Sequence, residues 1–136
     1  MSVVQKVKAA LVGTQEERLI LVRDSNRLVA RAVMQSPKLS EHDIESFASM
    51  KDICDDALRI IAQNRRYMKL YSVVRALVNN PRTPIDIGLQ LLKRIHDQDL
   101  KYVAINRNIA DVIRRGADKM ARQKEEAAKP KMPGKH

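Results

Sequence analysis

The chain has 136 residues, the usual size of one domain, and 44% of them are hydrophobic, which is enough for one continuous core. These residues are mainly aliphatic, with 3% aromatics and no tryptophan, and the four glycines and five prolines are too few to separate many short strands. The composition therefore favours helices. The 26 basic and 16 acidic residues give a formal net charge of +10, which attracts nucleic acids, anionic membranes and acidic proteins alike.

Several features exclude whole classes of protein. No stretch approaches the roughly 20 consecutive apolar residues of a membrane span, and Lys6 and Lys8 interrupt the apolar stretch at the N-terminus, so we expect no secretory signal. The single cysteine, Cys54, cannot form an internal disulfide. The four glycines are isolated from one another, which excludes a glycine-rich phosphate loop. These features predict a cytoplasmic protein.

The first two predicted helices have clear start signals. Ser2 can cap a helix that ends at Gly13, where we expect the left-handed conformation common after a helix. Thr14 and Glu17 form the pattern of a capping box, which opens a second helix through Val22. These signals are local, so they predict helix positions without any knowledge of packing.

The same signals continue along the chain. Ser25 can cap a third helix that stops before Pro37, Ser40 can cap a fourth, and Asp52 opens a fifth. The next helix contains Tyr71 and ends at 79–81. The pattern then predicts a helix capped by Thr83 with Pro84 at its first position, a short helix from Asp97 or Asp99 to Ala104, and a last helix over 109–122. The sequence thus predicts seven to nine helices and no strand, with a core containing Leu58, Ile61, Val74, Leu77, Leu91, Leu92, Leu100 and Val103.

Two stretches of the sequence recur at nearly the same spacing. Arg31-Ala32-Val33, followed by Pro37, matches Arg75-Ala76-Leu77, followed by Pro81, at an offset of 44 residues. Residues 58–65 match residues 100–107 at an offset of 42. A period in the low forties is typical of helix pairs that bury their apolar faces by stacking on one another. We therefore predict a stack of repeated helix pairs.

The stretch Ala76-Leu77-Val78-Asn79-Asn80-Pro81-Arg82-Thr83-Pro84 resembles repeats of the HEAT-like family and of its bacterial relative, the leucine-rich repeat variant. The chain also looks like uncharacterised bacterial helical-repeat proteins. The resemblance covers about residues 14–120. It implies an all-α fold, a right-handed α-α superhelix of stacked helix pairs of the HEAT or armadillo kind. It implies an interaction surface but no particular reaction.

The sequence predicts two parts, a helical-repeat domain over residues 1–123 and a disordered basic tail over 124–136, although residues 124–128 could extend the last helix by a turn or two. The tail is assigned because two prolines, a glycine and three lysines between Lys129 and Lys135 prevent regular packing.

We find no pattern of catalytic or metal-ligating residues. One cysteine and three scattered histidines, His42, His96 and His136, cannot supply a local zinc site. The acidic pair Asp55-Asp56 stands where helix capping explains it. We therefore expect no enzyme activity, no metal and no cofactor.

Basic residues are the one candidate site. The two repeat matches align Arg31 with Arg75, Arg59 with Lys101, and Arg65 with Arg107. Equivalent positions of a stacked solenoid would lie in line and form a stripe on its surface. Two interpretations stay open: these residues lie on a solvated face, where some of them pair with Asp or Glu four residues away, or they bind a polyanion by releasing its counterions. The candidate anion- or partner-binding residues are Arg31, Arg59, Arg65, Arg66, Arg75, Arg82, Lys101, Arg107, Arg114 and Arg115.

The function predicted from these observations is a non-catalytic binding or scaffolding module of helical-repeat type whose partner is another protein. The alternative is sequence-nonspecific electrostatic binding of duplex DNA through the basic stripe. Because a short stack exposes apolar helix faces at its ends, a homodimer formed through one end is also open.

Overall fold

The computed structural model describes residues 1–130. This part of the chain contains nine α-helices, one short 3-10 turn and no strand, which confirms the predicted all-α fold and the predicted helix number. The elements are α1 (Val3–Val12), α2 (Gln15–Leu21), α3 (Arg27–Met34), α4 (Glu41–Ala48), α5 (Asp55–Gln63), η1 (Tyr67–Lys69), α6 (Tyr71–Val78), α7 (Ile85–Leu92), α8 (Asp97–Ala104) and α9 (Asp111–Ala128).

Three helices begin with a capping box at the residues that the sequence indicated, Ser2, Thr14 and Ser40. In each box the cap side chain accepts a backbone N–H of the first turn, and the side chain at the third helical position accepts the N–H of the cap residue. Three predicted starts were wrong. Asn26 rather than Ser25 caps α3, and α5 begins after Cys54 rather than at Asp52. Pro84 rather than Thr83 is the cap residue of α7, which begins at Ile85.

The structure corrects the predicted conformation of Gly13. Its φ is −78°, so the residue is extended and not left-handed. Glycine is needed here for a different reason, because a Cβ at this position would overlap the backbone carbonyl oxygen of Ala9. That carbonyl accepts the N–H of Gly13 at 2.8 Å, which ends α1 with a close backbone contact.

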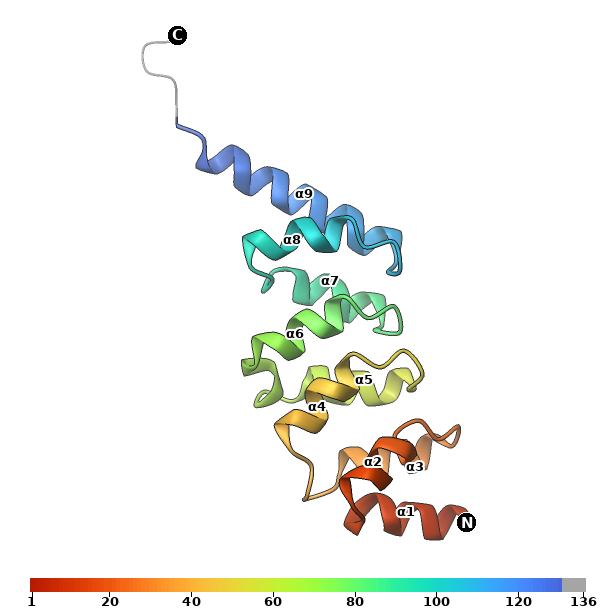
Figure 1. Ribbon diagram of the computed structural model, residues 1–136. Helices are drawn as coiled ribbons and strands as arrows, with labels where there is room; N and C mark the ends of the chain where they lie inside the picture. Colours follow the sequence, from red (N-terminus) through yellow and green to blue (C-terminus); the bar gives the residue numbers. More distant parts are fainter. Residues whose placement is uncertain (131–136) are drawn as a thin grey trace.

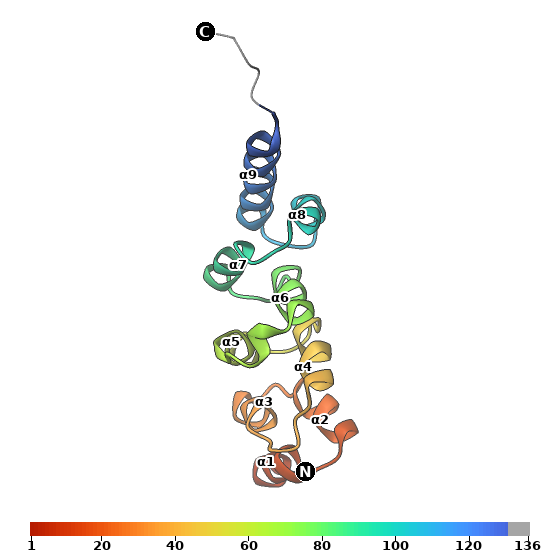
Figure 2. The same ribbon diagram turned by 90° about the vertical axis from the view of Figure 1, so that its left-hand side faces the viewer.

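The helices form two layers along one stack (Figures 1 and 2). Figure 2 shows α1, α3, α5 and α7 on one side of the stack and α2, α4, α6 and α8 on the other. We call these the odd layer and the even layer. The described chain runs from one end of the stack to the other, so each helix packs only against near neighbours in the sequence. The handedness of the stack stays a prediction.

The repeat length predicted from the sequence was wrong. Odd-layer helices begin at residues 3, 27, 55 and 85, and even-layer helices at 15, 41, 71 and 97, so a helix pair takes only 24 to 30 residues. The offset of 44 relates α3 to α6, and the offset of 42 relates α5 to α8. Each of these matches therefore joins a helix of one layer to a helix of the other.

The core is one continuous cluster between the layers, and it extends from Ala10 in α1 to Ala117 in α9. All eight residues predicted to be in the core are buried, which confirms that prediction. Full burial of one leucine or isoleucine side chain contributes about 1.5–3 kcal/mol, so the aliphatic composition accounts for the cohesion of the stack.

The last helix is longer than predicted. Helix α9 continues through Ala128, so the predicted boundary between residues 123 and 124 lies inside a helix, and 124–128 are not a disordered tail. Two glycines allow α9 to approach α7 closely. A Cβ at Gly88 would lie 2.9 Å from Cδ1 of Ile113, and a Cβ at Gly116 would lie 3.0 Å from Cδ1 of Leu92. The part of the predicted tail over 131–136 lies outside the described residues.

A buried ion pair joins α2 to α4. Nη2 of Arg18 lies 3.1 Å from Oδ2 of Asp43, and both side chains are almost fully buried. The carboxylate also accepts the Ser40 N–H at 3.1 Å and the Gln15 side-chain amide at 3.1 Å, while Nη1 of Arg18 donates to the Gly13 carbonyl. Burial alone would raise the pKa of Asp43, but the hydrogen bonds from Ser40 and Arg18 outweigh it and lower that pKa.

This lowered pKa predicts an acid dependence of stability. Because the folded-state pKa of Asp43 lies below the ordinary value of 3.8, its stabilisation is complete above that value and is lost as the pH falls through the folded-state pKa. We expect the free energy of unfolding to fall in this acid range, and to fall less in the Asp43→Asn variant. Urea denaturation of both proteins at a series of pH values measures the difference. Equal pH profiles would contradict the assigned role of Asp43.

The connections between helices are also bonded to one another. The buried side chain of Asn80, between α6 and α7, donates at 2.8 Å to the carbonyls of Ala48 and Met50 at the end of α4. Its oxygen accepts the Arg82 N–H at 2.9 Å. Ser36 makes the equivalent bond from the α3–α4 connection to the Leu11 carbonyl of α1. These polar side chains satisfy helix-end carbonyls that would otherwise be unpaired.

Candidate binding surface

Four of the predicted basic residues occupy the same position in their helices. Arg31, Arg59, Arg75 and Lys101 are each the fifth residue of α3, α5, α6 and α8. In the odd layer, Arg31 pairs with Asp56 at 3.6 Å, and Arg59 pairs with Asp86 at 3.3 Å. Each pair therefore joins a helix to the next helix of its own layer. Because Arg31 and Arg59 lie in the odd layer and the other two in the even layer, the four do not form one stripe.

The even layer repeats this arrangement. The guanidinium of Arg75 on α6 lies 4.0 Å from Oδ2 of Asp99, which is in the first turn of α8. The ammonium of Lys101 pairs instead with Glu125 of α9, at 2.9 Å. These four residues therefore pair with carboxylates of other helices, and not with carboxylates four residues away as the first interpretation expected. Exposed pairs of this kind contribute little to stability.

Of the other six candidate basic residues, three pair with a carboxylate and three do not. Arg66 lies 3.9 Å from Glu41, and Arg114 and Arg115 pair with Asp111 at 3.0 and 2.7 Å. No carboxylate among residues 1–130 pairs with the remaining three, which are Arg65, Arg82 and Arg107. Figure 1 places the α5–α6 connection, which holds residue 65, on the edge of the stack opposite the α6–α7 and α8–α9 connections.

Tyr71 and His96 form a stacked pair that the sequence did not indicate. Their ring centroids are 3.6 Å apart, and the rings are almost parallel. The Tyr71 hydroxyl donates to Asp99 at 2.5 Å and accepts the His96 N–H at 3.0 Å. Burial, with a further contribution from Asp99, raises the pKa of Tyr71. The cluster joins α6 to α8 through the bond from the Tyr71 hydroxyl to Asp99 and the bond from the backbone N–H of His96 to that hydroxyl.

A wide hollow of the described surface lies on α8. It has a volume of about 640 Å³ and is lined by Gln98, Asp99, Lys101, Tyr102 and Ile105. Tyr102 is 69% exposed and Ile105 is 72% exposed, although both are large apolar side chains. The sequence did not indicate this pair, because the pattern of one helix cannot show whether another helix covers Tyr102 and Ile105.

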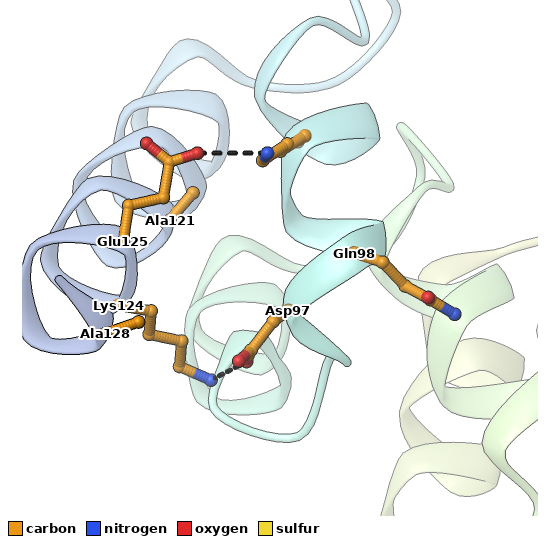
Figure 3. A pocket seen from close by; sticks show the side chains of 7 residues that line it. Asp97, Gln98, Ala121, Lys124, Glu125 and Ala128 are labelled. Atoms are coloured by element: carbon orange, nitrogen blue, oxygen red, sulfur yellow. Dashed lines mark hydrogen bonds and ion pairs between the residues drawn. The ribbon is translucent and has the colours of Figure 1, made fainter. Parts of the chain in front are cut away.

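Two further hollows adjoin this one and share Lys101 with it. The first, shown in Figure 3, has a volume of about 220 Å³ and lies between α8 and α9, with Ala121 and Ala128 among its lining residues. Ion pairs cross it from Lys101 to Glu125 and, at 2.5 Å, from Lys124 to Asp97. The second has a volume of about 430 Å³ and is lined partly by Ala104 and Arg122. We call the three hollows together the α8–α9 groove.

The remaining chemistry candidates lie apart. Among residues 1–130, no three His, Cys, Asp or Glu side chains come together as metal ligands. His42 is exposed, and Cys54 is a half-buried free thiol at the start of α5. In the same part of the chain, no helix combines the length and the apolar character needed to cross a bilayer. Exposed apolar residues also occur at the N-terminal end of the stack, where Met1 and Val4 are 76% and 79% exposed.

Comparisons with known proteins assign no family. The chain matches no family model, no curated protein and no solved structure. The resemblance to HEAT-like repeats therefore stays a prediction, and the function has to be argued from the surface described above.

Proposed function

We propose that the protein is a non-catalytic helical-repeat module that binds another protein through the α8–α9 groove. The observation that carries the proposal is the exposure of Tyr102 and Ile105 beside a hollow of about 640 Å³. Aromatic and large aliphatic side chains that line a concave surface are typical anchors of protein interfaces. The small side chains of Ala104 and Ala121 leave room for a partner to approach the groove.

Electrostatic binding of duplex DNA is the second candidate, and the ion pairs argue against it. Seven of the ten candidate basic residues already pair with a carboxylate, so they would have to give up an ion pair to bind phosphate. The net charge of +10 and the three remaining arginines keep the candidate open. Those arginines, at positions 65, 82 and 107, are divided between two edges of the stack.

A salt titration separates the two functions. Each phosphate contact contributes about 0.9 to the log–log salt slope of B-DNA binding, so loss of two contacts would lower the slope by about 1.8. We expect the Arg65→Glu/Arg107→Glu variant to change the slope by much less than this, as measured by fluorescence anisotropy with a labelled duplex. A fall by the full amount, with tight binding at low salt, would favour the DNA function.

The protein partner is tested by affinity capture with the full chain, identification of the captured protein, and measurement of its binding with purified components. We expect binding to the Tyr102→Ser/Ile105→Ser variant to be lost and binding to Leu28→Ser to be kept. Leu28 is a suitable control because it is 62% exposed on the odd layer. A partner that binds both variants equally would place the binding surface elsewhere and contradict the proposal.

A further inference from the structure

Three ion pairs within the layers share one arrangement, although Arg27, the first residue of α3, also pairs with Asp55 and Asp56 of α5. The fifth residue of a helix pairs with an acidic residue in the first turn of the next helix of the same layer, as in Arg31–Asp56, Arg59–Asp86 and Arg75–Asp99. The acidic residue is the second or third residue of its helix in every case. In these three pairs, a basic residue at the fifth position of one helix faces a carboxylate at the second or third position of the next helix in its layer.

Lys101 has the same helical position but a different kind of partner. It is the fifth residue of α8, and α8 is the last even-layer helix of the described chain. Its ammonium pairs with Glu125 of α9, a helix that follows the odd layer and packs on α7 and α8. Both side chains of this pair stay more than half exposed, at 64% and 57%. Lys101 therefore keeps a solvent-facing charge at the place where an even-layer successor would supply its partner.

The surface beside Lys101 is more apolar than the matching surface of the preceding helices. Tyr102 and Ile105 occupy the sixth and ninth positions counted from the start of α8. The same two positions hold serines 46 and 49 in the α4 segment, Ala76 and Asn79 in the α6 segment, and Ile20, which is 67% exposed, and Arg23 in the α2 segment. Stacking within this chain therefore does not require large apolar side chains here. The terminal helix carries them on a surface that no described helix covers.

The groove is also poorly suited to a polyanion. Four carboxylates, those of Asp97, Asp99, Asp118 and Glu125, line its three hollows together with Lys101, Arg122 and Lys124. A phosphate backbone would bring many negative charges against these carboxylates, whereas a helix with one apolar face could place a single acidic residue at Lys101 and apolar residues on Tyr102 and Ile105.

Resting on the proposed function, we propose that the α8–α9 groove binds an amphipathic α-helix of a partner protein, which takes the next place in the even layer and pairs an acidic residue of its first turn with Lys101. The apolar face of this helix packs on Tyr102 and Ile105, as helices packed in hydrophobic grooves do. The acidic residue pairs with Lys101 as Asp99 pairs with Arg75 within the chain, and Lys101 gives up its exposed pair with Glu125, which solvent screens and which contributes little to stability.

The test uses two synthetic peptides of about 20 residues, long enough to form a helix, with identical apolar faces. One carries aspartates at the second and third helical positions, and its twin carries lysines there. With the full chain, we expect the acidic peptide to bind at least about tenfold more tightly, in fluorescence anisotropy, than its twin. Lys101→Glu should reverse the preference, and Tyr102→Ser/Ile105→Ser should weaken both peptides.

Arg59→Glu is the matched control, because Arg59 holds the same helical position as Lys101 but its successor helix is present. It should leave peptide binding unchanged. Equal binding of the two peptides, absence of binding, or an unchanged preference in Lys101→Glu would overturn the proposal. Sedimentation of the chain alone supplies a further test. A dimer that Tyr102→Ser/Ile105→Ser abolishes would assign the groove to a second copy and also overturn it.

The two proposals can fail separately. If the peptides fail but a captured protein still requires Tyr102 and Ile105, the protein-binding function stands and only the helical occupant is wrong. If a captured protein binds without these two residues, the proposed function of the groove is wrong as well.

Discussion

Replacement of Asp43 by alanine is expected to lower the free energy of unfolding by about 3–5 kcal/mol, because it leaves the buried Arg18 guanidinium without its partner. The change also removes the carboxylate that accepts the Ser40 N–H in the capping box of α4. Urea denaturation followed by far-ultraviolet circular dichroism measures the loss.

Asp52→Ala is the matched control. Asp52 also pairs with an arginine of the preceding part of the stack, Arg23, but its side chain is 66% exposed. We expect little change in this variant, since solvent screens the pair. The double variant Arg18→Met/Asp43→Leu should recover much of the stability, because an apolar pair replaces both charges. If Asp43→Ala were no more damaging than Asp52→Ala, the buried pair would not be supporting the α2–α4 contact.

Asn80→Asp is expected to be almost as damaging at neutral pH, with a loss of about 3–5 kcal/mol, because a buried charge would have no compensating partner. The amide of Asn80 donates to two carbonyl oxygens at 2.8 Å, and a carboxylate of the same shape would place a negative oxygen against both. Mild acid should restore part of the stability, since a protonated carboxyl can donate again.

Asn106→Asp tests whether the effect arises from these two carbonyls. Asn106 is half-buried in the α8–α9 connection, and its amide donates only to the Asn79 side chain, at 3.0 Å. We expect a clearly smaller loss and a weaker dependence on pH in urea denaturation. Equal losses in the two variants would show that any charge in a connection is harmful, and not the charge beside the end of α4.

Features that depend on a few adjacent residues could be predicted from the sequence. The capping boxes at Ser2, Thr14 and Ser40 are complete within four residues, so the sequence located three helix starts correctly. The core was also predictable, because helical periodicity alone separates buried from exposed positions. The start of α5 was not, since Cys54 makes no side-chain cap bond and Asp52 pairs with Arg23 instead of capping.

The layer assignment could not be obtained from sequence similarity. Helices of both layers place a basic residue at the fifth position, as Arg31 and Arg75 show. Helices of both layers also bury the apolar residues at their third, fourth and seventh positions, as α3 and α6 do. A match between two segments therefore reports the position within a helix and not the layer. For this reason the recurring basic residues were identified correctly as equivalent helical positions, but the stripe predicted from them spans two layers.

The candidate groove was only partly predictable. Lys101 was identified because its charge recurs, whereas nothing in the residue types of Tyr102 and Ile105 shows that these two apolar side chains are exposed. Their exposure depends on the absence of a following even-layer helix in the described chain, which is a property of the whole stack.

The stacking of neighbouring helices also bears on how the chain folds. The longest-range side-chain hydrogen bond among residues 1–130 joins Asn80 to Ala48, only 32 positions apart. Folding therefore closes no large loop, and chains with such a low contact order fold quickly. During synthesis, each helix pair can pack on its predecessor soon after it leaves the ribosome, so the N-terminal helices do not have to wait, with their apolar faces exposed, for α9 to be made.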